Sequence, residues 1–117
     1  VGEITALTEE SDQNRLLGKQ GSYYAKIVFA SPLVDQSRVI GSNLAERGID
    51  AGGSIEVFET EEAAKKRCDY IATYDGTFMK AGTHAVIGTV LVRTSDELTA
   101  SQQKQLEANI IAALTRL

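Results

Sequence analysis

One stretch of the chain, GGSIEVFETEEAAKKRCDYI at residues 52–71, constrains the fold more than any other. Two glycines favour a turn, and the apolar alternation that follows in residues 54–59 is typical of a short strand. Thr60 is a natural N-cap, and two glutamates come directly after it, where the helix dipole favours acidic side chains. The stretch therefore predicts a strand followed by a helix that runs to about Tyr74.

Two more strands are predicted, one on each side of this unit. Residues 22–30 (SYYAKIVFA) alternate in character, which places Tyr23 and Phe29 on the same face of a strand. Residues 84–94 (HAVIGTVLVRT) are almost continuously apolar, which is typical of a central strand. We expect a loop before that strand, at residues 77–83.

Two more helices complete the pattern. Residues 35–48 indicate a helix, with Asp35 as a cap at its start and Gly48 just past its end in the left-handed conformation. Thr99 begins the last helix, and Gln102 completes a capping-box pattern three residues later. The apolar stripe expected on that last helix consists of Leu106, Ile110, Ala113, Leu114 and Leu117.

The order of these elements defines the expected fold class. Strand and helix alternate in βαβαβα order, which predicts an α+β domain built as a two-layer sandwich. We expect a sheet of three to four strands with about three helices packed on it. Residues 22–117 would form this single domain, and residues 1–21 a polar lead-in that packs on it through Leu16 and Leu17.

Charge and hydropathy exclude several classes of protein. The 117 residues carry 12 basic and 16 acidic side chains, a net charge of −4, which disfavours binding to nucleic acid or to an anionic lipid surface. No apolar run approaches the length of about 20 residues that a membrane span needs. No signal-peptide pattern is present, and because the chain begins with Val1 we expect a processed or trimmed fragment.

The sequence offers few residues for metal, cofactor or covalent chemistry. One cysteine and one histidine cannot supply a tetrahedral zinc site without several carboxylates, so we expect no metal. The glycines at 51–53 precede a strand, whereas glycine loops that hold phosphate or dinucleotides follow a strand and open a helix. We therefore expect no cofactor and no catalytic constellation.

Cys68 is open to two interpretations. It lies on the helix face of Ala64 and Ile71, late in the helix, where the dipole disfavours a thiolate. Free cysteine is also among the most buried residue types, so we interpret it as part of the core. The alternative is that Cys68 is a nucleophile paired with His84. For His84 itself, the structural interpretation is a residue at the surface or at the edge of a strand.

Glu56 and Arg93 are charged residues within predicted strands. A charged pair across the sheet, or an arginine that reaches Asp12 in the lead-in, is the structural interpretation, because half-buried charges are usually paired. A ligand-binding arginine is the functional interpretation, because its planar fork suits carboxylate or phosphate. Tyr24 and Tyr70 belong to a set of four tyrosines that could offer an aromatic face to a sugar or peptide, or simply rim a core.

Several motifs follow one another along most of the chain. They are Asp-x-Asn-x-Leu-Leu-Gly, Gly-Gly-x-x-Glu-Val-Phe, an Ala-x-x-Arg helix ending in Tyr-Ile, and Gly-x-Val-Leu-x-Arg followed by Leu-Thr-x-x-Gln. Together they resemble a family of small C-terminal domains in secreted or surface lipoproteins of Gram-positive bacteria. The family usually continues its opening with Arg-Pro, where this chain has Lys19 and Gln20. The matching positions are Asp12, Asn14, Leu16, Leu17, Gly18, Tyr24, Gly52, Gly53, Glu56, Val57, Phe58, Ala64, Arg67, Tyr70, Ile71, Gly88, Val90, Leu91, Arg93, Leu98, Thr99 and Gln102.

The resemblance implies a location more than a chemistry, because the family has no assigned activity. It implies a non-catalytic accessory or ligand- or partner-binding domain of a bacterial cell-surface lipoprotein, on the extracellular face of the membrane. The lipidated cysteine would lie upstream of this chain, and the partner would be a protein, a peptide or a small molecule. Arg67 joins the polar candidates through this resemblance. The alternative function is a thiol-dependent enzyme that uses Cys68 with His84.

Overall fold

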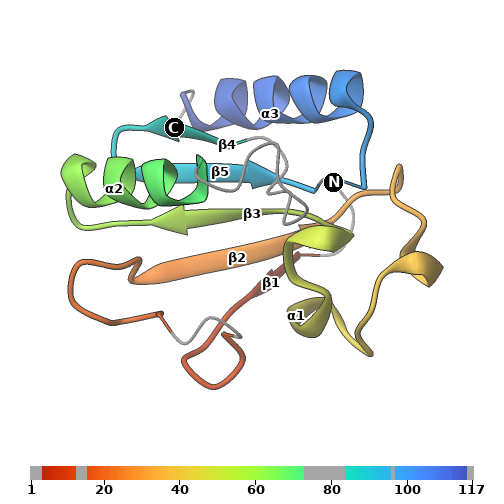
Figure 1. The fold of residues 1–117 in the computed structure, drawn as a ribbon, viewed down its shortest axis with the longest axis horizontal. Helices are drawn as coiled ribbons and strands as arrows, with labels where there is room; N and C mark the ends of the chain where they lie inside the picture. Colours follow the sequence, from red (N-terminus) through yellow and green to blue (C-terminus); the bar gives the residue numbers. More distant parts are fainter. Residues whose placement is uncertain (1–3, 13–15, 73–83, 96, 116–117) are drawn as a thin grey trace.

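The chain folds as an α+β domain with one antiparallel sheet and α-helices packed against it (Figure 1). The computed structural model describes residues 4–12, 16–72, 84–95 and 97–115. Within them, the strands are β1 (Ile4–Ala6), β2 (Ala25–Ala30), β3 (Gly52–Val57), β4 (His84–Ile87) and β5 (Val90–Thr94). The helices are α1 (Leu44–Arg47), α2 (Glu61–Ala72) and α3 (Ala100–Leu114).

The sheet has five strands in the order β1-β2-β3-β5-β4, and every neighbouring pair is antiparallel. β3 therefore lies at the centre, between β2 and β5. In this register Glu56 of β3 lies opposite Lys26 of β2, and Arg93 of β5 lies opposite Ser54 of β3. Three charged side chains are thus brought to the middle of one face of the sheet.

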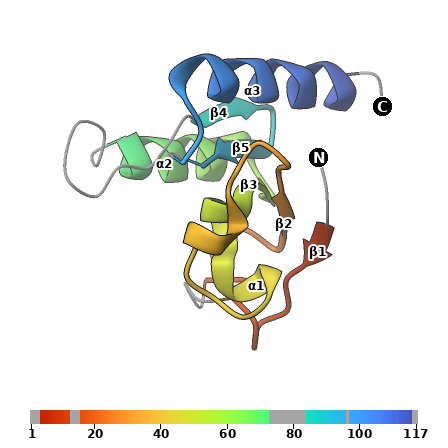
Figure 2. The ribbon, with the colours of Figure 1, turned by 90° about the vertical axis from the view of Figure 1, so that its right-hand side faces the viewer.

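The two long helices cover opposite faces of the sheet, so the arrangement is not the expected two-layer sandwich. Leu91 packs in a cluster with Ile71 of α2, whereas its neighbour Val92 packs with Ile110 of α3. Because successive strand residues point to opposite faces, α2 and α3 must lie on different sides of β5, as Figure 2 shows. The sequence of β5 is almost continuously apolar because both faces of the strand are covered.

The expected third strand is in fact a hairpin. Ile87 pairs with Val90, which leaves Gly88 and Thr89 as a two-residue loop between β4 and β5. Gly88 has a φ of 58°, a conformation that two-residue hairpin loops require and glycine adopts without strain. With β1 in the lead-in as well, the sheet exceeds the expected three to four strands, and the order is ββαβαββα rather than βαβαβα.

The helix expected over 35–48 is mostly replaced by turns. Only α1 is α-helical, and it is flanked by 3₁₀ turns at residues 36–38 and 48–51. Gly41 has a φ of 136°, far from helical, and Asn43 caps the short helix that follows. Asp35 caps the first 3₁₀ turn through the Ser37 amide. Gly48 has a positive φ of 60°, but its ψ of −141° lies outside the left-handed conformation that was expected.

The caps predicted for the two long helices are confirmed. The Ala63 amide donates to Thr60 Oγ1 at 3.1 Å, and Thr99 and Gln102 form the expected capping box. In the predicted stripe of α3, Ile110 is buried, Leu106 and Leu114 pack beside it, and Ala113 is exposed. The expectations for Tyr74, for residues 77–83 and for Leu117 lie outside the described residues.

The prediction that Tyr23 and Phe29 share a face is wrong. Tyr23 packs edge-on against Phe58 in the cluster beneath α2, with ring centroids 6.0 Å apart, whereas Phe29 packs with Val92 on the α3 side. β2 begins only at Ala25, so strand alternation does not extend back to Tyr23. Leu16 and Leu17 pack against the same cluster as Tyr23, as expected for the lead-in.

Candidate functional site

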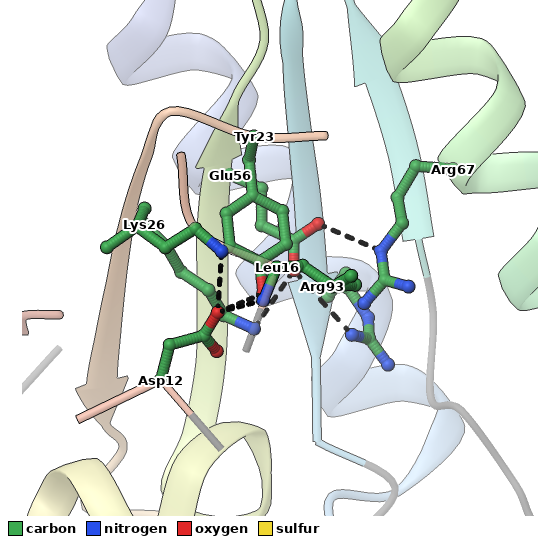
Figure 3. A network of polar contacts seen from close by, with 8 residues as sticks. Asp12, Leu16, Tyr23, Lys26, Glu56, Arg67 and Arg93 are labelled. Atoms are coloured by element: carbon green, nitrogen blue, oxygen red, sulfur yellow. Dashed lines mark hydrogen bonds and ion pairs between the residues drawn. The ribbon is translucent and has the colours of Figure 1, made fainter. Parts of the chain in front are cut away.

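A fully buried carboxylate, that of Glu56, lies at the centre of the most polar part of the sheet (Figure 3). Lys26 Nζ lies 3.0 Å from Glu56 Oε2, outside hydrogen-bonding geometry, and forms an ion pair with it. Arg67 Nε donates to Oε1 at 3.3 Å, and Arg93 Nη1 lies 3.8 Å from Oε2. One anion is therefore shared by three cations.

The cations come from three different elements. Lys26 lies opposite Glu56 in the register of β2 and β3, and Arg93 belongs to β5 on the other side of β3. Arg67 belongs to α2, which packs on this face of the sheet through Ala64 and Ile71 in the core. The expected ion pair of Glu56 and Arg93 across the sheet is thus present, within a larger network.

The network is short of negative charge. Burying an ion is costly unless it is paired, and three cations share a single carboxylate. Burial lowers the pKa of Arg93 below the ordinary arginine value, and Arg67 lowers it further, while Glu56 and, to a smaller extent, Tyr23 and Asp50 oppose both. Arginine stays charged even so, because its unperturbed pKa lies far above neutral pH. The buried Arg93 Nε makes no hydrogen bond within the part of the chain that the structure describes.

Asp12 is the second buried carboxylate and fixes the lead-in. It is 2% exposed, and its Oδ2 accepts hydrogen bonds from the amides of Leu16 and Leu17 at 2.9 Å each and from the Tyr23 hydroxyl at 2.8 Å. The Tyr23 ring lies 5.1 Å from Lys26 Nζ and 5.9 Å from Arg67 Cζ, within range of cation–π attraction. Asp12 therefore acts on the network indirectly, by holding Tyr23.

A cleft of about 870 Å³ opens above this network, on the face covered by α1 and α2. The lead-in forms one wall, α1 and the 3₁₀ turn after it another, and α2 a third. The partly exposed apolar lining comes from Leu7, Leu16 and Ile49, with the buried Phe58 and Ile71 behind it. Its charged lining, in the described residues, consists of Lys19, Lys26, Arg47, Lys66, Arg67 and Arg93 with Asp12 and Asp50.

The polar residues singled out from the sequence mostly meet here. Asp12, Arg67 and Arg93 line the cleft around Glu56, and Tyr70 lines its α2 side with its ring 5.8 Å from Arg67 Cζ. Tyr24 does not join them: it is 53% exposed and does not line the cleft.

Two members of the network were not singled out as polar candidates from the sequence. Lys26 is only 5% exposed, and Tyr23 is fully buried. A lysine between apolar residues in a predicted strand was a signal that Lys26 could be a buried, paired charge. The identity of its partner could not be predicted, because it depends on the pairing of β2 with β3.

Cys68 and His84 lie closer together than their separation in the sequence suggested. Cys68 Sγ is 3.4 Å from His84 Nδ1, where β4, an edge strand, begins beside α2. Cys68 packs against the expected core cluster but stays partly exposed, and His84 is half-buried. The core interpretation is therefore right about the helix face but incomplete, since the thiol contacts an imidazole. Neither residue lines the cleft above Glu56.

Comparisons of the chain with protein-family models, with curated proteins and with solved structures gave no match. Function is therefore inferred from geometry and from the motifs in the sequence. Among the described residues, no group of three or more histidine, cysteine, aspartate or glutamate side chains is placed to hold a metal ion. In the same part of the chain, no helix has the length and apolar character needed to cross a membrane.

Replacing Glu56 with glutamine should be strongly destabilising, because three cations would then surround a neutral amide. Removing one partner of a buried ion pair costs about 3–5 kcal/mol, and we expect Glu56→Gln to lower the free energy of unfolding by that amount. Urea denaturation measures it. Glu59→Gln, an exposed site two residues beyond the end of β3, is the matched control and should change stability by less than about 0.5 kcal/mol. A loss below about 1 kcal/mol for Glu56→Gln would contradict the central role of this carboxylate.

Proposed function

We propose that this chain is a non-catalytic ligand-binding domain of a bacterial cell-surface lipoprotein, and that its ligand binds in the cleft above Glu56. The distribution of charge carries the proposal. Six of the twelve lysines and arginines of the chain line this one cleft, although acidic residues outnumber basic ones overall. A cleft that concentrates one sign of charge attracts ligands of the opposite sign.

The shape and composition of the cleft support binding rather than catalysis. It combines apolar walls with convergent charged groups, as small-ligand sites do. Three of its cations, Lys26, Arg67 and Arg93, are held by Glu56, so they are oriented before any ligand arrives. The one cysteine and the one histidine lie outside its described lining, so covalent chemistry at a thiol would have to occur elsewhere.

A small-anion screen tests the binding proposal. Solutions of the ¹⁵N-labelled chain are titrated with anionic, cationic and neutral compounds of similar size while amide chemical shifts are recorded. We expect only the anions to shift resonances of cleft residues such as Lys19, Asp50 and Arg67. Equal shifts from neutral compounds, or shifts scattered over the whole surface, would contradict the proposal.

The lipoprotein part of the proposal rests on the sequence motifs. The full-length protein should fractionate with the membranes of the bacterium that makes it, through a lipidated cysteine upstream of this chain. Protease added to intact cells should digest it, because the domain would face outward. Immunoblotting of fractions measures both properties, with a cytoplasmic enzyme as the protected control. Recovery in the cytosolic fraction, resistant to protease until lysis, would overturn this part.

A second candidate function is favoured by the contact between Cys68 and His84. A thiol 3.4 Å from an imidazole nitrogen could transfer its proton to that nitrogen and become a nucleophilic thiolate. The surroundings favour a structural contact instead. Cys68 lies in the last half of α2, away from the helix N-terminus that would stabilise a thiolate, and it packs against apolar side chains.

Thiol labelling of the native chain at pH 7 separates these candidates. If the contact is structural, Cys68 should react about tenfold or more slowly than free cysteine, because it is partly buried in apolar surroundings. His84→Ala should then leave the rate unchanged or raise it by opening the site. Faster reaction than free cysteine, slowed by His84→Ala, would establish an activated thiol and support the enzyme.

A further inference from the structure

We infer that the group recognised in this cleft is the phosphate of a small organic phosphate monoester, bound as a dianion against Arg67 and Arg93. The inference rests on the proposed function, since it names the ligand class of the same cleft. Three observations carry it: the arrangement of the two guanidinium groups, an unpartnered buried donor, and the balance of charge.

The two guanidinium groups lie near each other above Glu56 (Figure 3). The two positive charges repel each other. Burial is the main cause that lowers the pKa of Arg93, and the charge of Arg67 lowers it as well. Glu56 engages one nitrogen of each, Nε of Arg67 and Nη1 of Arg93. The remaining N–H groups of two adjacent forks can be shared by one tetrahedral oxyanion, which relieves the repulsion that a single carboxylate leaves.

The Nε atom of Arg93 is buried and has no hydrogen-bond partner among the described residues. An unsatisfied buried donor is costly, and the cost is greater when the group is charged. Arg93 lines the cleft, but its Nε has almost no accessible surface, so a ligand oxygen can accept this hydrogen bond only after the Arg93 side chain shifts toward it.

The charge of the cleft favours a dianion over a carboxylate. Among the described residues, six cations line it, and the opposing carboxylates there are those of Asp12 and Asp50 in the lining and Glu56 beneath it. Three positive charges are left over, more than a single carboxylate can neutralise. A phosphate monoester carries close to two negative charges above its second pKa, which is about 6.

The size of the cleft favours an ester over the free ion. At about 870 Å³ it has room for much more than one phosphate group. Leu7, Leu16 and Ile49 are partly exposed in the lining and offer apolar surface, and the exposed Tyr70 ring adds an aromatic surface on the α2 side. The organic part of the ligand would pack against these side chains while its phosphate faces the arginines.

Chemical-shift titrations of the folded chain at pH 7.5 test the inference, with phenyl phosphate, benzoate and inorganic phosphate as probes. Phenyl phosphate and benzoate share a ring and differ in charge and in the shape of the anion. We expect phenyl phosphate to bind roughly fivefold to tenfold more tightly than benzoate, because of the additional charge. Inorganic phosphate should bind at the same residues but more weakly than phenyl phosphate, because it leaves the apolar wall empty.

Two exposed lysines of α2 provide matched variants that keep the buried network intact. Lys66 lines the cleft and its neighbour Lys65 does not, so Lys66→Gln should weaken phenyl phosphate binding by roughly threefold and Lys65→Gln should leave it unchanged. Equal effects of the two variants would show nonspecific attraction to α2 and overturn the inference.

The outcomes also separate this inference from the proposed function. If benzoate binds in the cleft as tightly as phenyl phosphate, or more tightly, the phosphate assignment is wrong while the ligand-binding cleft stands. If none of the three anions shifts cleft resonances, both the assignment and the proposed function are wrong. Tighter binding of inorganic phosphate than of phenyl phosphate would overturn the ester and leave an oxyanion site.

Discussion

The ion pairs of Glu56 are the interaction on which the rest of the structure depends. A fully buried carboxylate at the centre of a sheet is tolerable only when it is paired, and its partners come from β2, β5 and α2. The network therefore fixes the position of α2 over the sheet as well as the charges. Asp12 extends it by anchoring the lead-in and the Tyr23 ring beside Lys26 and Arg67. On this face of the sheet, the same contacts therefore stabilise the fold and position the residues of the candidate site.

The charges in this network are not balanced in the way expected if the network served stability alone. Apolar residues of similar volume would often stabilise such a position as well or better. Here one carboxylate is surrounded by three cations, and a buried nitrogen of Arg93 lacks a partner. Local arrangements that sacrifice stability tend to mark functional sites. On the opposite face, Phe29, Val92 and Ile110 pack together and supply the apolar support.

The sequence predicts the elements whose signals are local, and it fails where the signal lies in the pairing of distant segments. A strand followed by a helix in residues 52–71 and both long-helix caps follow from neighbouring residues and are confirmed, but Gly52 and Gly53, expected in a turn, already pair with β2 as the start of β3. The hairpin at Gly88 resembles one continuous apolar strand, because both of its arms are covered. Lys26 and Tyr23 gain their roles only through the register of β2 with β3 and the bend before β2. The contact of Cys68 with His84 likewise depends on where β4 pairs.

The most direct test of the central claim is whether removing Lys26 rescues the loss of Glu56. If Glu56 neutralises Lys26, the lysine charge becomes uncompensated in Glu56→Gln, and adding Lys26→Met removes it. The double variant should then recover about 1 kcal/mol or more of the unfolding free energy lost in the single variant, a coupling within the range for contacting residues. If Lys26→Met instead lowers stability by the same amount with and without Glu56, the two charges are not coupled and the account is wrong.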